Sequence, residues 1–274
     1  MKSIIKIFST ICGFVILCVC LTGCGGQLKS EVKLNIKGNY VTSNLSEMGV
    51  FYAESSTDGD IAKNYKITLD YSVDDTILYK TNAVVKVNDN GNVVAFAKRV
   101  KNNVGESVQN IDYYYKDGAI FVHIENGKSD IEYKQENVLP ESFLTDLNES
   151  INYLRLSNSL SEYSGVNTQI EKSLKADWCK WKITRTLEED QIVMEFYYIY
   201  DGDMLTGIKG TIAQPYIDNL PESLTTKANS LDAEDKSITL NFAIQYDTSS
   251  IVYPKNIGNY SATIPENCDV KNVF

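Results

Sequence analysis

Hydrophobic and polar residues alternate along much of this chain with a period of two, which is typical of β-strands. In residues 65–71, for example, Tyr65, Ile67, Leu69 and Tyr71 share one face. The stretches between the alternating runs are rich in Asn, Asp, Ser and Gly, which favour turns. The pattern predicts strands over residues 31–40, 65–71, 82–87, 93–100, 111–115, 120–124, 129–134, 178–187, 191–200, 204–212, 237–246 and 258–264.

Two segments break this period. Between residues 140 and 163, Phe143, Leu147, Ile151 and Leu154 recur at steps of three and four, and Pro140 suits the first turn of a helix. Residues 221–231 resemble a shorter helix that also opens with Pro. We therefore expect an α+β, mainly β fold, in which one or two helices bury an apolar stripe against the sheet. Residues 41–62 and 247–256 are expected to be loops, the former with an irregular strand pair as an alternative.

The turn between residues 82–87 and 93–100 is the strongest hairpin signal, because Asn and Gly in residues 88–92 tolerate positive φ angles. Similar acidic turns occur at residues 58–60 and 201–203, and their side-chain oxygens could in principle bind Ca²⁺. None completes a twelve-residue calcium loop with its terminal Glu. Turn chemistry accounts for all three, so neither a metal site nor a cofactor is expected.

The two halves of the chain share two short matches. Residues 113–118 (Tyr-Tyr-Tyr-Lys-Asp-Gly) resemble residues 197–202 (Tyr-Tyr-Ile-Tyr-Asp-Gly), and Leu-Pro-Glu-Ser occurs at residues 139–142 and again at 220–223. Order and near-spacing are kept. A duplication into two similar halves and a chance match both account for this.

The first 24 residues have the three parts of a secretory leader. Lys2 and Lys6 give a positive start, residues 7–21 are mostly apolar, and Leu21-Thr22-Gly23-Cys24 resembles the bacterial lipobox at all four positions. This predicts a signal peptide at residues 1–23, a diacylated Cys24, a tether at residues 24–30 and one domain at residues 31–274. The alternative, an uncleaved membrane anchor, requires about 20 apolar residues.

A lipidated Cys24 would place the domain on the extracytoplasmic side of the cell membrane, held by acyl chains such as palmitate. The formal net charge of −10 argues against a nucleic-acid partner, since phosphate binding needs clustered Lys and Arg. The same balance predicts no electrostatic attraction to anionic lipid, so the acyl chains would do the anchoring.

Beyond Cys24 and the leader, two cysteines remain, Cys179 and Cys268. Outside the cytoplasm they could form a disulfide worth about 2–4 kcal/mol, or they are two unrelated thiols. His123 is the only histidine. It could act as a general base beside Glu125, two residues further on the same face, or be an ordinary strand residue. No nucleophile stands at a recognisable spacing, so we expect no enzymatic activity.

Aromatic side chains are concentrated on the predicted strands and could line a ligand pocket or simply form the core. An apolar pocket with a few polar groups is the form expected of a ligand site. The candidate lining residues are Tyr113, Tyr115, Trp178, Trp181, Phe196 and Tyr198 on strands, with Phe143 and Leu147 on the predicted helix.

The order of residues 113–118, residues 120–123, Asn-Gly-Lys at 126–128 and a following helix resembles Gram-positive lipoproteins similar to the outer-membrane lipoprotein carrier LolA and to LppX. Residues 197–203 and 260–266 resemble two later stretches of that family. The resemblance implies a strongly curved antiparallel sheet, a half-open barrel, that wraps one or two helices and holds an acyl chain or other apolar ligand. The alternative function is an envelope interaction or structural module with a filled interior. The long acidic section at residues 47–60 departs from the carriers, so no residue role of the family can be assigned there.

Overall fold

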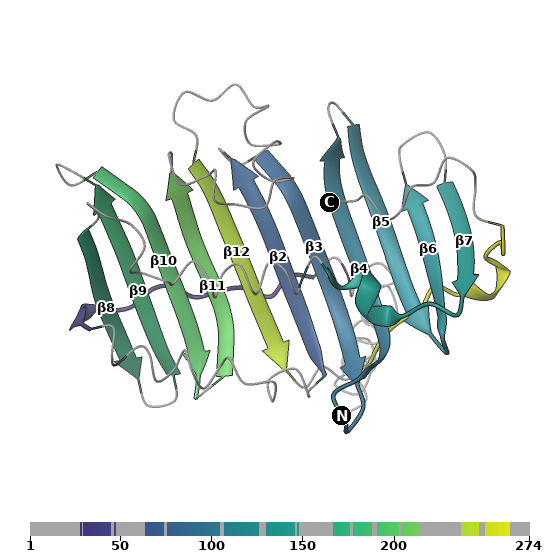
Figure 1. Cartoon of the computed structure of the whole chain (residues 1–274), viewed down its shortest axis with the longest axis horizontal. Coiled ribbons are helices and arrows are strands. Elements are labelled where there is room, and N and C mark those ends of the chain that lie inside the picture. The colour runs from purple at the N-terminus through teal and green to yellow at the C-terminus, as the bar shows by residue number, and fades with distance from the viewer. Residues whose placement is uncertain are drawn as a thin grey trace, which may run out of the picture.

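A computed structural model describes residues 28, 30–44, 47, 64–73, 76–104, 107–125, 130–145, 147, 167–175, 178–187, 191–202, 204–213, 237–246 and 250–263. They form one twelve-stranded antiparallel sheet (Figure 1). The strands are β1 (Val41–Ser43), β2 (Tyr65–Val73), β3 (Thr76–Val87), β4 (Val93–Val104), β5 (Ser107–Lys116), β6 (Ala119–Glu125), β7 (Asp130–Glu136), β8 (Asn167–Lys175), β9 (Trp178–Leu187), β10 (Gln191–Asp201), β11 (Met204–Ala213) and β12 (Ser237–Tyr246). Within these described ranges there are also two 3-10 turns, η2 (Pro140–Phe143) and η5 (Ile257–Asn259). The mainly β prediction is confirmed.

The order of strands in the sheet is β1-β8-β9-β10-β11-β12-β2-β3-β4-β5-β6-β7, and the sheet is not closed. From β2 the chain runs outward to the β7 edge through successive hairpins. It then starts again near the other edge with β8 and returns inward to β12, which pairs with β2. The centre of the sheet is therefore a pairing between strands that lie far apart in the sequence.

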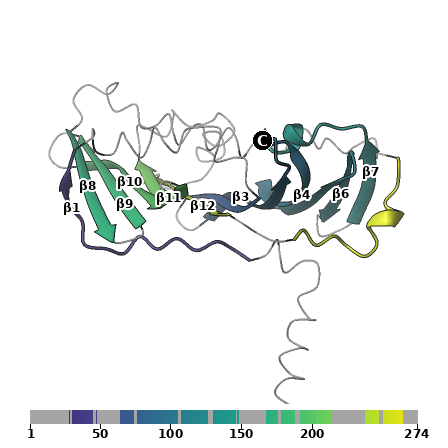
Figure 2. The same ribbon diagram turned by 90° about the horizontal axis from the view of Figure 1, so that it is seen from below.

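The two faces of the sheet carry different side chains. On one face, which we call the apolar face, alternate residues of β2 are buried: Tyr65, Ile67, Leu69, Tyr71 and Val73. The antiparallel register places apolar residues of β3–β6 and of β9–β12 on this same face. Lys66, Thr68 and Asp70 point to the opposite face. The ends of the sheet bend toward the apolar side, which gives a shallow trough (Figure 2).

Two extended segments cross the opposite face, which we call the strap face (Figure 2). The N-strap, residues 30–44, begins near the middle of the sheet, where the Val32 N–H donates to Thr68 Oγ1 of β2 at 3.2 Å. Further along, Lys180 Nζ of β9 donates to the Lys37 carbonyl at 2.7 Å. The strap ends at the sheet edge, where β1 pairs with β8.

The C-strap, residues 250–263, covers the other half of this face. Tyr253 Oη donates to the Tyr115 carbonyl of β5 at 3.3 Å. At the far edge, the Lys134 N–H of β7 donates to the Ser261 carbonyl at 2.7 Å. Together the straps cover much of a face that an isolated sheet would leave to solvent.

The straps correct two strand predictions. Residues 31–40 form no ladder with any described strand, although their alternation is real: Val32, Leu34 and Ile36 are half-buried against the sheet, and the residues between them are exposed. The strand predicted over residues 258–264 is likewise wrong, because its described part holds η5 and a single bridge from Ser261 to Tyr133. An extended chain on an apolar support shows the same period as a strand in a sheet.

Most other strands match their predictions to within a few residues, but β8 was not predicted, since its apolar residues are few. The predicted helix at residues 140–163 begins as the 3-10 turn η2, and its remainder from residue 148 lies outside the described residues. The helix predicted at 221–231 and residues 48–63 also lie outside them.

The matched stretches at residues 113–118 and 197–202 occupy similar turns but opposite faces. Gly118 and Gly202 both have positive φ angles, 77° and 56°. Tyr113, however, lies on the apolar face, whereas Tyr197 lies on the strap face, where its ring contacts Tyr40 of the N-strap. The match therefore reflects shared turn chemistry and not residue-by-residue equivalence.

Candidate functional site

Most of the aromatic residues singled out as candidate ligand-lining groups lie on one face of the sheet; the side chain of Trp178 lies outside what the structure describes. Five of them are buried on the apolar face: Tyr113, Tyr115, Trp181, Phe196 and Tyr198. Phe143 and Leu147, which follow β7, pack against the same core. These residues form two groups, one on β5 and one on β9 and β10, with five strands between them.

The β5 group is built around Tyr113 and Tyr115. The ring of Tyr115 stacks on Phe96 with centroids 5.6 Å apart, and Tyr113 lies 6.0 Å from Phe143. Lys98, a buried residue of β4, donates from Nζ to the Phe143 carbonyl at 2.8 Å and lies 5.5 Å from the Tyr113 ring centroid. This lysine holds the η2 turn to the sheet, because its charge is satisfied there by a carbonyl and an aromatic face.

The β9–β10 group packs closely. Phe196 and Tyr198 lie 6.2 Å apart, and Trp181 of β9 is paired with Tyr198 in the register. A Cβ atom at Gly210 of β11 would overlap the Phe196 ring, whose Cγ is 2.8 Å from that position. The absence of a side chain at Gly210 therefore leaves the room that the Phe196 ring occupies.

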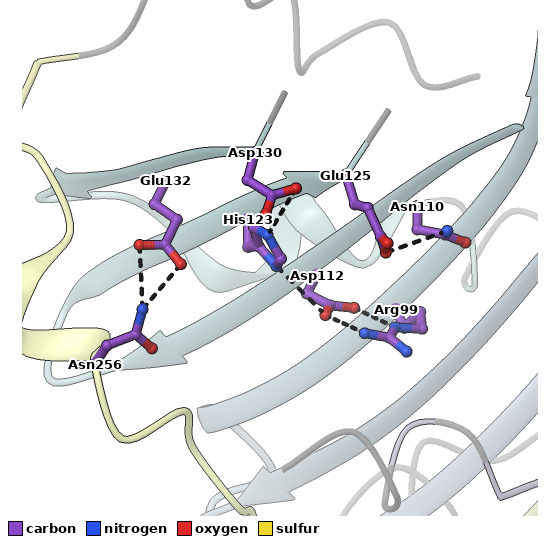
Figure 3. Close-up of polar contacts among 8 residues, drawn as sticks. All are labelled: Arg99, Asn110, Asp112, His123, Glu125, Asp130, Glu132 and Asn256. Atoms are coloured by element: carbon purple, nitrogen blue, oxygen red, sulfur yellow. Dashed lines mark hydrogen bonds and ion pairs between the residues drawn. The ribbon is translucent and has the colours of Figure 1, made fainter. Parts of the chain in front are cut away.

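A cluster of polar residues lies on the strap face of β4–β7 (Figure 3). At its centre Arg99 donates from Nε and Nη2 to the two carboxylate oxygens of Asp112. Asp112 is 5 % exposed, so the bidentate pair is largely shielded from water. These hydrogen bonds raise the pKa of the Arg99 guanidinium. Around this pair, Glu125 accepts from Asn110, and Glu132 accepts from Asn256 of the C-strap.

His123 lies in this cluster but is not paired with Glu125, the carboxylate that the spacing suggested. Its Nδ1 is 4.0 Å from Asp112 Oδ2, and its Nε2 is 3.9 Å from Asp130 Oδ1. Both distances exceed those of a hydrogen bond. Of these two carboxylates, Asp112 is the buried one, and it is engaged by Arg99.

Two grooves lie along the straps. One, of about 460 Å³, is bordered by the C-strap and the ends of β5–β7, with Phe121, Lys134 and Ile257 in its lining. The other, of about 290 Å³, follows the N-strap beside Asp70 and Lys209. Burial raises the pKa of Asp70, which accepts a hydrogen bond from Asn241 at 2.8 Å. Both grooves mix polar and apolar groups, unlike the apolar pocket predicted for the other face.

The remaining sequence candidates are placed only in part. Cys24 and Cys268 lie outside the described residues, and Cys179 lies on β9, paired in register with Leu174 and Tyr200. Within the described ranges, no three His, Cys, Asp or Glu side chains are grouped as metal ligands would be. In the same ranges, no helical segment has the length and hydropathy that a membrane span requires.

The chain positions limit the disulfide hypothesis. Ser261 is bridged to Tyr133 on β7, nine strand spacings from β9, which is about 43 Å at 4.8 Å per strand. The seven residues from Ser261 to Cys268 span at most about 25 Å. Disulfide-linked Cα atoms lie about 4.4–6.8 Å apart. We therefore predict that Cys268 and Cys179 are not bridged to each other within one chain.

No family model matches this sequence, and a search of curated proteins finds no relative.

Sequence reasoning missed the Arg99–Asp112 pair and the buried Lys98. Arg99 and Asp112 lie on consecutive predicted strands, and only their register, Arg99 opposite Asp112, brings them together. Opposite charges facing each other across a hairpin are a recognisable signal once the register is known. The predicted strands, 93–100 and 111–115, left ten residues between them and so no defined register, whereas β4 and β5 continue to Val104 and Ser107. The pair could therefore not be derived from the sequence.

Proposed function

We propose that this protein is a lipoprotein anchored through Cys24 to the extracytoplasmic side of the cell membrane. We further propose that its domain binds an apolar ligand and catalyses no reaction. The observation that carries the proposal is the apolar face, on which aromatic and aliphatic side chains from nearly every strand form one surface across an open sheet. A lipid or acyl chain is the class of ligand that fits such a surface, because its binding requires mainly apolar contact.

The finer fold expectation is part of the same proposal. A half-open barrel of the LolA and LppX type, closed over by helices, would turn this face into a ligand-holding interior. The single antiparallel sheet with bent ends supports this arrangement (Figure 2). Fold similarity alone does not assign a ligand, so the proposal depends on direct detection of bound lipid.

A specific observation favours a second function, an envelope interaction or structural module with a filled interior. Phe196 occupies the space over Gly210 in one group, and Phe96 stacks on Tyr115 in the other. At these two positions, side chains and not an empty pocket fill the space. If the whole interior were packed in this way, partners would bind the outer surface instead.

The anchor is tested by growing cells with radiolabelled palmitate. The wild-type protein should be labelled and recovered with membranes, and the Cys24→Ser variant should be neither. An unlabelled wild-type protein would remove the anchor from the proposal.

The ligand is tested on the full chain extracted from membranes. Native mass spectrometry should show an added mass that organic extraction identifies as a lipid. In the emptied protein, a brominated fatty acid should quench tryptophan fluorescence through Trp181, because this residue lies on the apolar face.

The two tryptophans make this experiment specific. Trp178→Phe should keep most of the quenching, whereas Trp181→Phe should lose most of it. No added mass together with no quenching in the wild-type protein would instead support the filled interaction module.

A further inference from the structure

The described chain begins on the strap face of the sheet. Leu28 is 1 % exposed and forms a small apolar cluster with Ala97 of β4 and Tyr114 of β5. Ile251, Tyr253 and Ile257 of the C-strap pack against the same cluster. Leu28 is thus held between the straps and the sheet, and the N-strap leads away from it across β2.

This placement limits how far the domain can move from the proposed anchor. Cys24 precedes Leu28 by four residues, which span at most about 14 Å when fully extended. From β4 to the β7 edge is three strand spacings, about 14 Å, and passing around that edge adds the thickness of the sheet, about 10 Å. The tether is too short to lead around the edge, so it cannot bring the apolar face to the membrane.

The strap face also carries lysines that form no ion pair with a described carboxylate. In the part of the chain that the structure describes, no carboxylate lies within ion-pair distance of six of them: Lys33, Lys37, Lys86, Lys101, Lys209 and Lys255. Lys33, Lys37 and Lys255 are exposed, and the others are partly so. Lysines near an anionic bilayer surface are attracted to it electrostatically.

Most carboxylates of this face already have partners. Lys182 lies 3.5 Å from Glu171 and 3.3 Å from Glu195, and Arg99 engages Asp112. Asp70 lies opposite Lys80 in the register, shares a groove with Lys209 and accepts a hydrogen bond from Asn241. Glu125 and Glu132 accept from amide groups, and Asp130 lies near His123. Among the described residues of this face, lysine and arginine slightly exceed carboxylates, although the whole chain has a net charge of −10. The acidic excess of the chain lies among residues outside the described ranges, and the described part of this face is not acidic.

We propose that the strap face is the surface that this protein presents to the bilayer, with anionic lipid headgroups as its partner. The apolar face is then turned away from the membrane. This inference rests on the proposed acylation of Cys24. It also qualifies the expectation that an acidic chain has no attraction to anionic lipid, because the average charge does not describe this face.

The test uses full-length acylated protein on vesicles of phosphatidylcholine and phosphatidylglycerol in a ratio of three to one. A water-soluble amine reagent modifies accessible lysines, and mass spectrometry measures the rate at each one. Lys33, Lys37 and Lys209 should react several-fold more slowly than in the Cys24→Ser protein mixed with the same vesicles. Each lysine thus serves as its own control.

A reporter on the other side of the sheet is supplied by Leu139→Lys. Leu139 is 74 % exposed and directly precedes η2, which packs on the apolar face. The new lysine should react equally fast in the acylated and the Cys24→Ser backgrounds. In addition, Lys37→Glu with Lys209→Glu should lessen the protection of Lys33 on anionic vesicles and leave sedimentation of the acylated protein unchanged.

The outcomes separate this inference from the proposed anchor. If the acylated protein sediments with vesicles but Lys33, Lys37 and Lys209 react at their solution rates, the orientation is wrong and the anchor stands. Equal protection of the Leu139→Lys reporter would also overturn the orientation. If acylated protein does not sediment with vesicles, the anchor fails and the orientation fails with it.

Discussion

The side chain of Leu34 in the N-strap fills the place that a Cβ atom would occupy at Gly207 of β11. Leu34 Cγ and Cδ1 are 3.1 and 3.2 Å from that position, and Cδ2 is closer still. The glycine lets an extended segment lie directly on a strand, which a side chain at this position would prevent. The N-strap is therefore fitted to the sheet by a specific contact.

This contact predicts the effect of Gly207→Ala. The added methyl group overlaps three carbons of Leu34, so the whole side chain must move, and we expect a loss of about 1–3 kcal/mol in the free energy of unfolding. Urea denaturation measures it. The double variant Gly207→Ala with Leu34→Ala should lose less than the sum of the two single changes, because the overlap is gone.

Gly258→Ala is the matched control, since no atom outside its chain neighbours lies within 4 Å of its Cβ position. It should change stability by less than about 0.5 kcal/mol. Strictly additive effects of Gly207→Ala and Leu34→Ala would show that the strap does not rest on this strand.

The Arg99–Asp112 pair should contribute to stability through charge pairing in a shielded place. Asp112→Ala leaves the guanidinium, whose side chain is 20 % exposed, without its carboxylate, and we expect a loss of about 2–3 kcal/mol. Thermal or urea unfolding gives the value. Asp130→Ala removes the other carboxylate near His123, but its side chain is 70 % exposed, so we expect little change.

A double replacement shows whether Asp112→Ala loses stability because Arg99 is left unpaired or because side-chain volume is lost. Arg99→Met with Asp112→Leu removes both charges and keeps apolar bulk, and it should recover much of the stability lost in Asp112→Ala. A double variant as unstable as Asp112→Ala would mean that the charges themselves are not the cause.

Tyr40 predicts a stability change at alkaline pH. Its hydroxyl donates to the Ile36 carbonyl at 2.7 Å, and burial, with Glu171 and Glu195 nearby, raises its pKa from 10.0 to about 12. Between these two values the folded protein keeps a proton that the unfolded chain has released. Stability from this group is therefore complete below pH 10 and is lost as the pH rises toward 12.

The measurement is the free energy of unfolding of wild type and Tyr40→Phe from pH 8 to pH 12. At pH 8 the variant should be less stable by about 0.5–1.5 kcal/mol, the usual contribution of one hydrogen bond. Its stability should then fall less steeply above pH 10. Parallel curves over the whole range would contradict the role of this hydroxyl.

The reach of the chain predicts that Cys179 and Cys268 are not bridged to each other. A tryptic map of the purified monomer without reductant should show their peptides separately, and unfolding should expose two thiols to iodoacetamide. Joined peptides in the monomer fraction would mean that the bridge from Ser261 to Tyr133 is not kept in solution.

Much of the fold could be predicted because strands and hairpins have local causes. The alternation in β9 and β12 and the turn at residues 88–92 identify these elements without any long-range information. In that turn Asn88 Oδ1 accepts from the N–H groups of Asn90 and Asn92, each at 3.0 Å, as the turn prediction requires. Within one strand, Tyr113 and Tyr115 share a face for the same local reason, as do Phe196 and Tyr198.

The sequence alone determined which residues are extended, where hairpins turn, and which side chains alternate toward an apolar surface, since these depend on neighbours a few positions away. Only the tertiary structure decided that residues 31–40 form a strap, that β12 pairs with β2, and that Arg99 meets Asp112. An extended segment shows the same alternation whether its backbone bonds to a neighbouring strand or its side chains rest on a sheet. The choice between these is made by contacts between distant parts of the chain, which no local pattern contains.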